Sequence, residues 1–135
     1  MVTSDGVLRV LIVDDEQLIA DTLAMILSRA GFKAWASYSG EDAVERAAVL
    51  APDVLVTDVV MRGINGIEAA IQITQMQPSC KVLLFSGQST SADLLYRSEA
   101  LGHHFELILK PVHPTELIER LNGYAYNRGQ AEAAL

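Results

Sequence analysis

The sequence predicts an α/β fold in which a parallel β-sheet is covered by helices on both faces. Five short apolar runs alternate with five segments whose apolar residues recur at helical spacing. The apolar runs are continuous, which is typical of strands that are buried on both faces of a parallel sheet. A length of 135 residues, half of them hydrophobic, suits one domain with a core of its own.

The first half of the chain predicts two helices between three strands. The segment 16–30 has apolar residues at helical spacing and is followed by Gly31 as a stop signal. Ser39 is expected to cap the second helix, with Asp42 three residues later in the manner of a capping box. Pro52 ends that helix. The predicted strands cover residues 8–13, 32–37 and 53–57.

The second half continues the same alternation. A Gly-rich loop, residues 61–66, leads into the third helix, and Pro78 breaks that helix. Pro114 stands at the first position of the last helix. The predicted helices cover residues 67–76, then from about 91 to 101, and then from 114 onward; the predicted strands cover 81–85 and 105–109.

Composition and charge exclude several classes of function. The net charge of −7 disfavours direct contact with nucleic-acid phosphates. There is no basic amphipathic segment for an anionic membrane, no signal peptide and no apolar run of membrane-spanning length. Cys80 is the single cysteine and cannot form an internal disulfide, so a small buried thiol is expected. These features together predict a soluble cytoplasmic protein.

Polar residues follow four of the five predicted strands. Because groups at the carboxyl ends of parallel strands collect at one edge of the sheet, we expect these side chains to converge there. The first, third, fourth and fifth strands deliver, in turn, Asp14-Asp15-Glu16, Asp58, Ser86-Gly87 and Lys110-Pro111.

Converging carboxylates require a cation or raised pKa values. Two unit charges about 4 Å apart repel by roughly 4 kcal/mol at an effective dielectric constant near 20. One lysine and one divalent ion would balance three aspartates, and oxygen ligands suit Mg²⁺ or Mn²⁺. The alternative is that Asp14, Asp15 and Glu16 only cap the first helix and complement its dipole.

In this order the residues resemble the receiver domains of two-component response regulators, over nearly the whole chain. The matching pieces are Val13-Asp14-Asp15-Glu16, Asp58 with Met61, Gly63 and Gly66, Ser86-Gly87, and Lys110-Pro111. The resemblance implies a flavodoxin-like, doubly wound five-stranded parallel sheet of order 2-1-3-4-5 with five helices. We expect residues 1–127 to form the receiver domain and residues 128–135 to be a flexible tail or the start of a linker.

The resemblance also implies a metal site. Asp15 and Asp58 would bind Mg²⁺ or Mn²⁺ directly, Asp14 would act through a water molecule, and the backbone carbonyl of Val60 would complete the protein's share. No other cofactor is expected.

The implied function is a phosphorylation-activated switch. Asp58 would accept a phosphoryl group from a histidine kinase or a histidine phosphotransfer protein. Ser86 would hydrogen-bond the phosphoryl oxygens and Lys110 would pair with their charge. The Lys110–Pro111 peptide bond is expected to be cis. The domain would catalyse its own phosphotransfer and slow dephosphorylation, without being an enzyme that acts on a separate substrate.

Several positions depart from the family pattern. Arg62 stands where the family often has proline; we expect it to loosen the loop and add charge without affecting the chemistry. Val60 and Gln88 are the variable positions that flank the phosphoryl site. Leu107 replaces a frequent aromatic residue, and Phe105 shares its strand face. These two and Ser86 are the expected switch residues, acting on an output face formed by the fourth helix, fifth strand and fifth helix.

Three other functions are known for folds of this kind or for related domains. Phosphatases with an aspartate nucleophile usually carry an acid or threonine where this chain has Val60. A flavodoxin-type flavin site needs a hydroxyl-rich loop where this chain has Asp14, Asp15 and Glu16, which would repel phosphate. A receiver-like docking or dimerisation module stays open as the alternative, although Asp58 and Lys110 are both present.

Overall fold

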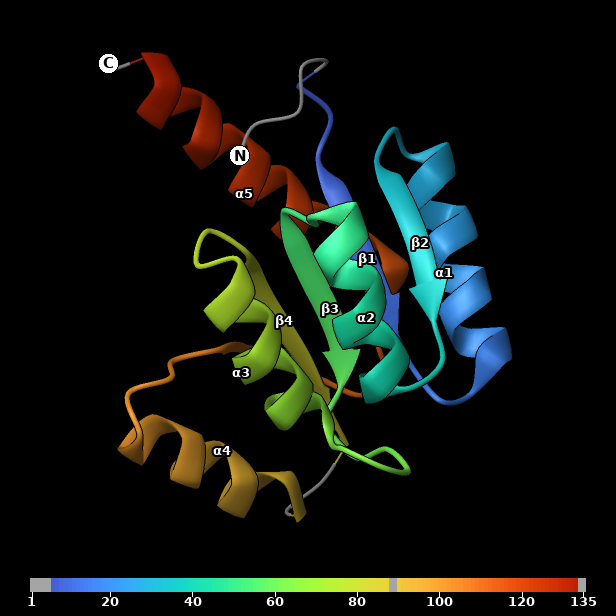
Figure 1. Cartoon of the computed structure of the whole chain (residues 1–135). Helices are drawn as coiled ribbons and strands as arrows, with labels where there is room; N and C mark the ends of the chain where they lie inside the picture. Colours follow the sequence, from blue (N-terminus) through green and yellow to red (C-terminus); the bar gives the residue numbers. More distant parts are fainter. Residues whose placement is uncertain (1–5, 88–89, 134–135) are drawn as a thin grey trace.

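The predicted alternation of strands and helices is confirmed. In a computed structural model that describes residues 6–87 and 90–133, five strands alternate with five helices (Figure 1). The strands are β1 (Arg9–Val13), β2 (Lys33–Ser37), β3 (Val54–Asp58), β4 (Lys81–Ser86) and β5 (Glu106–Leu109). The helices are α1 (Gln17–Arg29), α2 (Gly40–Leu50), α3 (Gly66–Met76), α4 (Thr90–Ala100) and α5 (Pro114–Ala133).

The five strands form one parallel sheet of order β2-β1-β3-β4-β5, as the resemblance implies. β1 lies between β2 and β3, so that Leu11 is paired with Trp35 on one side and Leu55 on the other. From the adjacent strands β1 and β3, the sheet continues to β2 on one side and to β4 and β5 on the other. The carboxyl ends of β1 and β3 therefore lie side by side at the point where ligands bind in sheets of this kind.

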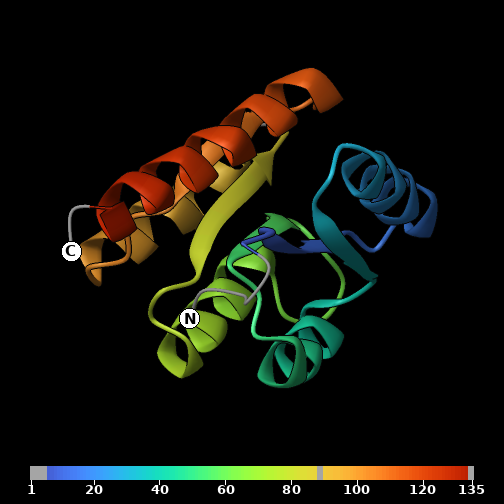
Figure 2. The same cartoon turned by 90° about the horizontal axis from the view of Figure 1, so that it is seen from above.

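Each face of the sheet has its own hydrophobic core. Val10 and Ile12 of β1 belong to the core beneath α1 and α5, whereas Leu11 and Val13 belong to the core beneath α2 and α3. Figure 2 shows these two helix pairs on opposite sides of the sheet. The alternation follows from the two-residue period of a strand, and it explains why β1 is apolar at four consecutive positions, Val10–Val13.

The helix caps partly follow the expected pattern. The Ser39 hydroxyl accepts a hydrogen bond from the Asp42 N–H at 3.0 Å and caps α2. The expected capping box does not form there, because the Asp42 carboxylate accepts from the Ser37 hydroxyl at 2.5 Å. A complete capping box occurs instead at α3, between Asn65 and Glu68.

The last helix differs from the expectation. α5 continues to Ala133, so the backbone of residues 128–133 is helical where a structureless tail was expected. Most residues of this segment are good helix formers, which explains the continuation. The domain boundary at residue 127 stays a prediction. Within the described parts of the chain, no helix is both long and apolar enough to cross a membrane.

Gly66 brings α3 unusually close to the end of β3. Its N–H donates to the carbonyl of Val59 at 2.8 Å and closes the loop between the two elements. A Cβ atom at this position would lie 1.9 Å from the carbonyl oxygen of Asp58 and 3.1 Å from the Thr57 hydroxyl oxygen. Only a residue without a side chain fits against this backbone.

Gly66→Ala is therefore expected to lower the free energy of unfolding by at least about 2 kcal/mol, because backbone must shift to admit the methyl group. Urea denaturation measures the change. Gly123→Ala in α5 is the control, since a Cβ there meets nothing within 4 Å. That change should be neutral or stabilise by up to about 1 kcal/mol. Equal losses in the two variants would contradict this account of Gly66.

Cys80 is buried, as expected, just before β4. Burial raises the pKa of its thiol to about 12, and the nearby charge of Asp53 adds to the shift. Iodoacetamide at about pH 8 should therefore modify the folded protein more than about a hundredfold more slowly than the protein in concentrated urea, since the thiolate is the reactive form. Alkylation at similar rates in both conditions would show that the thiol is accessible.

Candidate functional site

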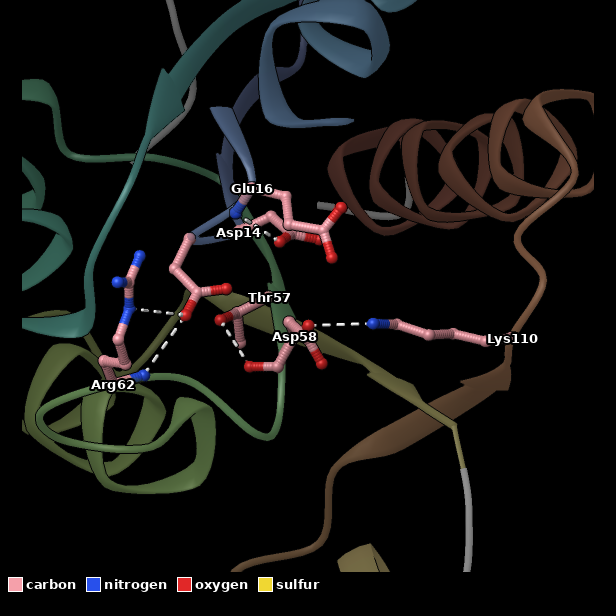
Figure 3. Close-up of polar contacts among 7 residues, drawn as sticks. Asp14, Glu16, Thr57, Asp58, Arg62 and Lys110 are labelled. Atoms are coloured by element: carbon pink, nitrogen blue, oxygen red, sulfur yellow. Dashed lines mark hydrogen bonds and ion pairs between the residues drawn. The ribbon is translucent and has the colours of Figure 1, made fainter. Parts of the chain in front are cut away.

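The sheet brings four predicted site residues together at its carboxyl edge (Figure 3). Asp58 is the last residue of β3, Asp14 and Asp15 follow β1, and Lys110 follows β5. One carboxylate oxygen from each aspartate lies within 4.8 Å of the other two. The Lys110 Nζ donates to Asp58 Oδ2 at 2.8 Å, so the ion pair spans from the edge strand to the centre of the sheet.

The Asp14 carboxylate is only half satisfied. Its side chain is buried, and Oδ1 accepts a hydrogen bond from the Glu16 N–H at 2.9 Å. Oδ2 is buried and has no hydrogen-bond partner among the described residues. Burial raises the pKa of Asp14; the hydrogen bond from Glu16 opposes the shift, and the charge of Asp58 adds to it. A buried acceptor without a donor is costly, which marks this oxygen as a place for a cation or a water molecule.

Helix capping does not account for the acidic cluster. Glu16 is the N-cap residue of α1, yet its side chain makes no capping hydrogen bond. Asp14 binds only the N–H of Glu16, and one of its oxygens still lacks a partner in the described structure. The capping alternative therefore explains at most one oxygen of Asp14.

Lys110 provides the positive charge of the site. Burial by itself would lower the pKa of its ammonium group, but the hydrogen bond and charge of Asp58 raise it, and the charges of Asp14 and Glu16 add to the rise. The net effect keeps the lysine protonated. A charge-assisted hydrogen bond of this kind is stronger than one between neutral groups.

The donor set suits a hard divalent cation. Three carboxylates within reach of one another, one with an unpartnered oxygen, are ligands that Mg²⁺ and Mn²⁺ prefer. Asp14, Asp15 and Asp58 would hold such an ion. Val60 lies two residues after Asp58 with an exposed side chain, and the role of its carbonyl stays a prediction.

Arg62, in the loop after β3, contacts the acidic cluster directly. Its backbone N–H donates to Asp15 Oδ2 at 3.2 Å, and its Nε lies 3.6 Å from the same oxygen. Figure 3 shows the arginine side chain reaching the acidic cluster from the loop after β3. The sequence indicated a positive charge near the site, but not that it would pair with a predicted metal ligand.

Of the predicted switch residues, Ser86 ends β4, Leu107 lies in β5, and Phe105 directly precedes β5, which begins one residue later than expected. Ser86 is buried at the end of β4, and its carbonyl accepts from the Lys110 N–H at 2.9 Å. Phe105 and Leu107 are partly buried against the core beneath α2 and α3. The Lys110–Pro111 peptide bond is cis, the geometry that the resemblance implies. Gln88 lies outside the described residues.

Two residues near the site gave no signal in the sequence. The Thr57 hydroxyl donates to the carbonyl of Asp58 at 3.0 Å, inside the buried end of β3. Glu41, in the first turn of α2, accepts from the Ile64 N–H at 3.1 Å and so holds the loop after β3. Both contacts support the backbone around Asp58, but only the contact of Glu41 with Ile64 joins segments that are far apart in the chain.

A cleft of about 720 Å³ opens beside the acidic site. Its walls combine residues of the site with α1, the end of β4 and the segment that leads from β5 into α5. The lining includes Asp14, Glu16, Leu18, Ile19, Phe85, Lys110, Val112 and Pro114. A large molecule can therefore approach the carboxylates from the side of α1.

The chain is similar in sequence to known proteins of one family. The response regulator receiver domain family matches residues 10–122. The chain is 34% identical to the chemotaxis protein CheY of Thermotoga maritima over 115 residues, which are 84% of this chain and 94% of that protein. It is 32% identical over 110 residues, 82% of its length, to the transcriptional regulatory protein CreB of Escherichia coli, of which it spans only 47%.

Solved structures agree with the sequence comparison. A CheY-like receiver domain from Methanospirillum hungatei has a TM-score of 0.81 over 93% of this chain and 98% of that chain; at 21% identity it supports the fold alone. The response regulator TrrA of Thermotoga maritima, solved in complex with Mg(2+)-BeF, has a TM-score of 0.73 and 28% identity over 86% of this chain and 97% of that chain. By fold, acidic site and sequence, the chain belongs to the response regulator receiver domain family of two-component signalling.

Proposed function

We propose that this chain is a phosphorylation-activated switch in a two-component phosphorelay, with Asp58 as the phosphoacceptor. A histidine kinase or a histidine phosphotransfer protein would donate the phosphoryl group. The observation that carries the proposal is the 2.8 Å ion pair between Lys110 and Asp58 beside two further aspartates. A carboxylate held between a fixed ammonium group and a cation-binding cluster is prepared for charge that arrives with a phosphoryl group.

The reaction is a displacement at phosphorus. An oxygen of Asp58 attacks the phosphorus of a phosphohistidine, an O–P bond forms, the P–N bond breaks, and the imidazole leaves. Lys110 offsets negative charge on the equatorial oxygens. Its pKa, raised by Asp58, keeps it charged throughout the physiological range. A divalent ion held by Asp14, Asp15 and Asp58 would neutralise the remaining charge.

The relatives support the same chemistry. TrrA was solved in complex with Mg(2+)-BeF, and beryllium fluoride resembles a phosphoryl group. The proposed metal dependence of this chain agrees with the presence of Mg²⁺ in that complex. The position of Val60 at the variable site after Asp58, without a polar group to orient water, favours a slow loss of the phosphoryl group.

Acetyl phosphate with Mg²⁺ is expected to add one phosphoryl group to the wild-type protein, at Asp58, as measured by intact-mass and peptide spectrometry. Asp58→Asn should abolish the label, because an amide is not a nucleophile for this reaction. Excess EDTA should slow labelling by at least about a hundredfold, the scale of losing one charge-stabilising group.

Asp93→Asn, which changes an exposed aspartate in the first turn of α4, is the matched control and should be labelled like the wild type. Labelling of Asp58→Asn to the wild-type level would refute the assignment. A wild-type protein that takes no label under any metal condition would favour the docking or dimerisation module instead.

The proposed output face is formed by α4, β5 and α5. Once phosphorylated, Asp58 would draw the Ser86 hydroxyl toward the phosphoryl oxygens, and Ser86 is paired in register with Leu109 of β5. Leu109 is 68% exposed and Leu107 is only partly buried, so this side of β5 has room to repack. Leu107 can fill the vacated space, but it has no hydroxyl with which to hydrogen-bond there.

Addition of beryllium fluoride and Mg²⁺ is expected to change amide NMR shifts in α4 and α5. Leu107→Ala should reduce these changes by about half or more, because alanine is too small to fill the space that Ser86 vacates. Val49→Ala on α2 removes a side chain that is 84% exposed and serves as control. If α4 and α5 stay silent in the wild type while another surface responds, the output face lies elsewhere.

A further inference from the structure

We propose that Arg62 is a resident counter-charge of the acidic site, which competes with the divalent metal ion for Asp15 and so raises the metal concentration that the site requires. The inference concerns regulation of the proposed phosphorylation site and rests on that function. It starts from the contact between Arg62, in the loop after β3, and Asp15.

The contact is directed at one oxygen. Asp15 Oδ2 receives the Arg62 N–H at 3.2 Å and has the Arg62 Nε at 3.6 Å. The Asp15 side chain is 23% exposed, whereas that of Arg62 is 89% exposed. The carboxylate is therefore held in the site, while the guanidinium group can leave it without any repacking of the core.

The balance of charge makes the guanidinium group and the metal ion alternatives. Three aspartates face Lys110 and Arg62, so the two cations leave the aspartates with one net negative charge. A divalent ion and Lys110 neutralise the aspartates without help. A metal ion bound to Asp15 repels the guanidinium group from the same carboxylate, so the two cations compete for Asp15.

The two contacts of Arg62 can be separated. The hydrogen bond to Asp15 comes from the backbone N–H of residue 62, which glutamine and lysine also have, so these substitutions keep that donor and change only the side chain. Two neighbouring contacts also hold this loop independently, namely Glu41 with the Ile64 N–H and Gly66 with the Val59 carbonyl. A change in metal affinity after substitution would therefore report on the guanidinium group.

The size of the effect follows from the exposure of the pair. Ion pairs between exposed side chains are worth little, which corresponds to a change of about two- to fivefold in a binding constant. Removal of the Arg62 side-chain charge should accordingly tighten metal binding by about two- to fivefold at low ionic strength. Salt screens exposed pairs, so the difference should shrink at high ionic strength.

The test measures Mn²⁺ binding to the whole chain by electron paramagnetic resonance of the free ion, without any phosphoryl donor. Arg62→Gln removes the charge and keeps a polar side chain; Arg62→Lys keeps the charge. Arg29→Gln is the control, because it removes one charge from the exposed last turn of α1, at the far end of that helix from the site. It changes the net charge of the protein by the same amount as Arg62→Gln.

We expect Arg62→Gln to bind Mn²⁺ about two- to fivefold more tightly than both the wild type and Arg29→Gln, with Arg62→Lys close to the wild type and with a smaller difference in concentrated KCl. The inference is overturned if Arg62→Gln matches Arg29→Gln, if it binds more weakly, or if Arg62→Lys binds as tightly as Arg62→Gln. A wild-type protein that binds no Mn²⁺ at any concentration would instead contradict the proposed function, so the two failures are distinguishable.

Discussion

The mutual repulsion of carboxylates at one edge of the sheet is the constraint around which this molecule is arranged. Because β1 and β3 are adjacent and parallel, Asp14 and Asp15 meet Asp58 at the same edge. At these separations each pair of charges costs roughly 3–4 kcal/mol at an effective dielectric constant near 20. Cations or raised carboxyl pKa values relieve this repulsion, and both occur here: Lys110, which follows β5, pairs with Asp58, and the pKa of Asp14 is raised.

The loop between β3 and α3 connects the acidic cluster to the rest of the fold. Gly66 brings the start of α3 against the carbonyl of Asp58, and Glu41 holds the Ile64 N–H from the side of α2. Arg62 lies between these two attachments and reaches Asp15. The loop next to the acidic cluster therefore has a backbone that is fixed by hydrogen bonds, and its one charged side chain, that of Arg62, is exposed.

The other side of the site leads toward the edge of the sheet. Lys110 and Ser86 are joined by a backbone hydrogen bond, so a change at Asp58 that moves Lys110 would act on the ends of β4 and β5 together. Only Ile108 of β5 is fully buried, and its Leu109 is largely exposed. A weakly covered edge strand is a reasonable place for a conformational change, because regions with few buried contacts need little free energy to rearrange.

The sequence by itself determined how strands and helices alternate along the chain, that the sheet is buried on both faces, and which residues form the acidic site. Periodicity and strand-end position sufficed for these features, because both are local properties of the chain. The order of the strands within the sheet was predicted from the resemblance to receiver domains. The tertiary structure decided which partners those residues have. The pairing of Arg62 with Asp15, the unpartnered oxygen of Asp14 and the close approach at Gly66 all depend on packing between segments far apart in the chain. A side chain on a loop can reach many neighbours, and only the folded backbone selects among them.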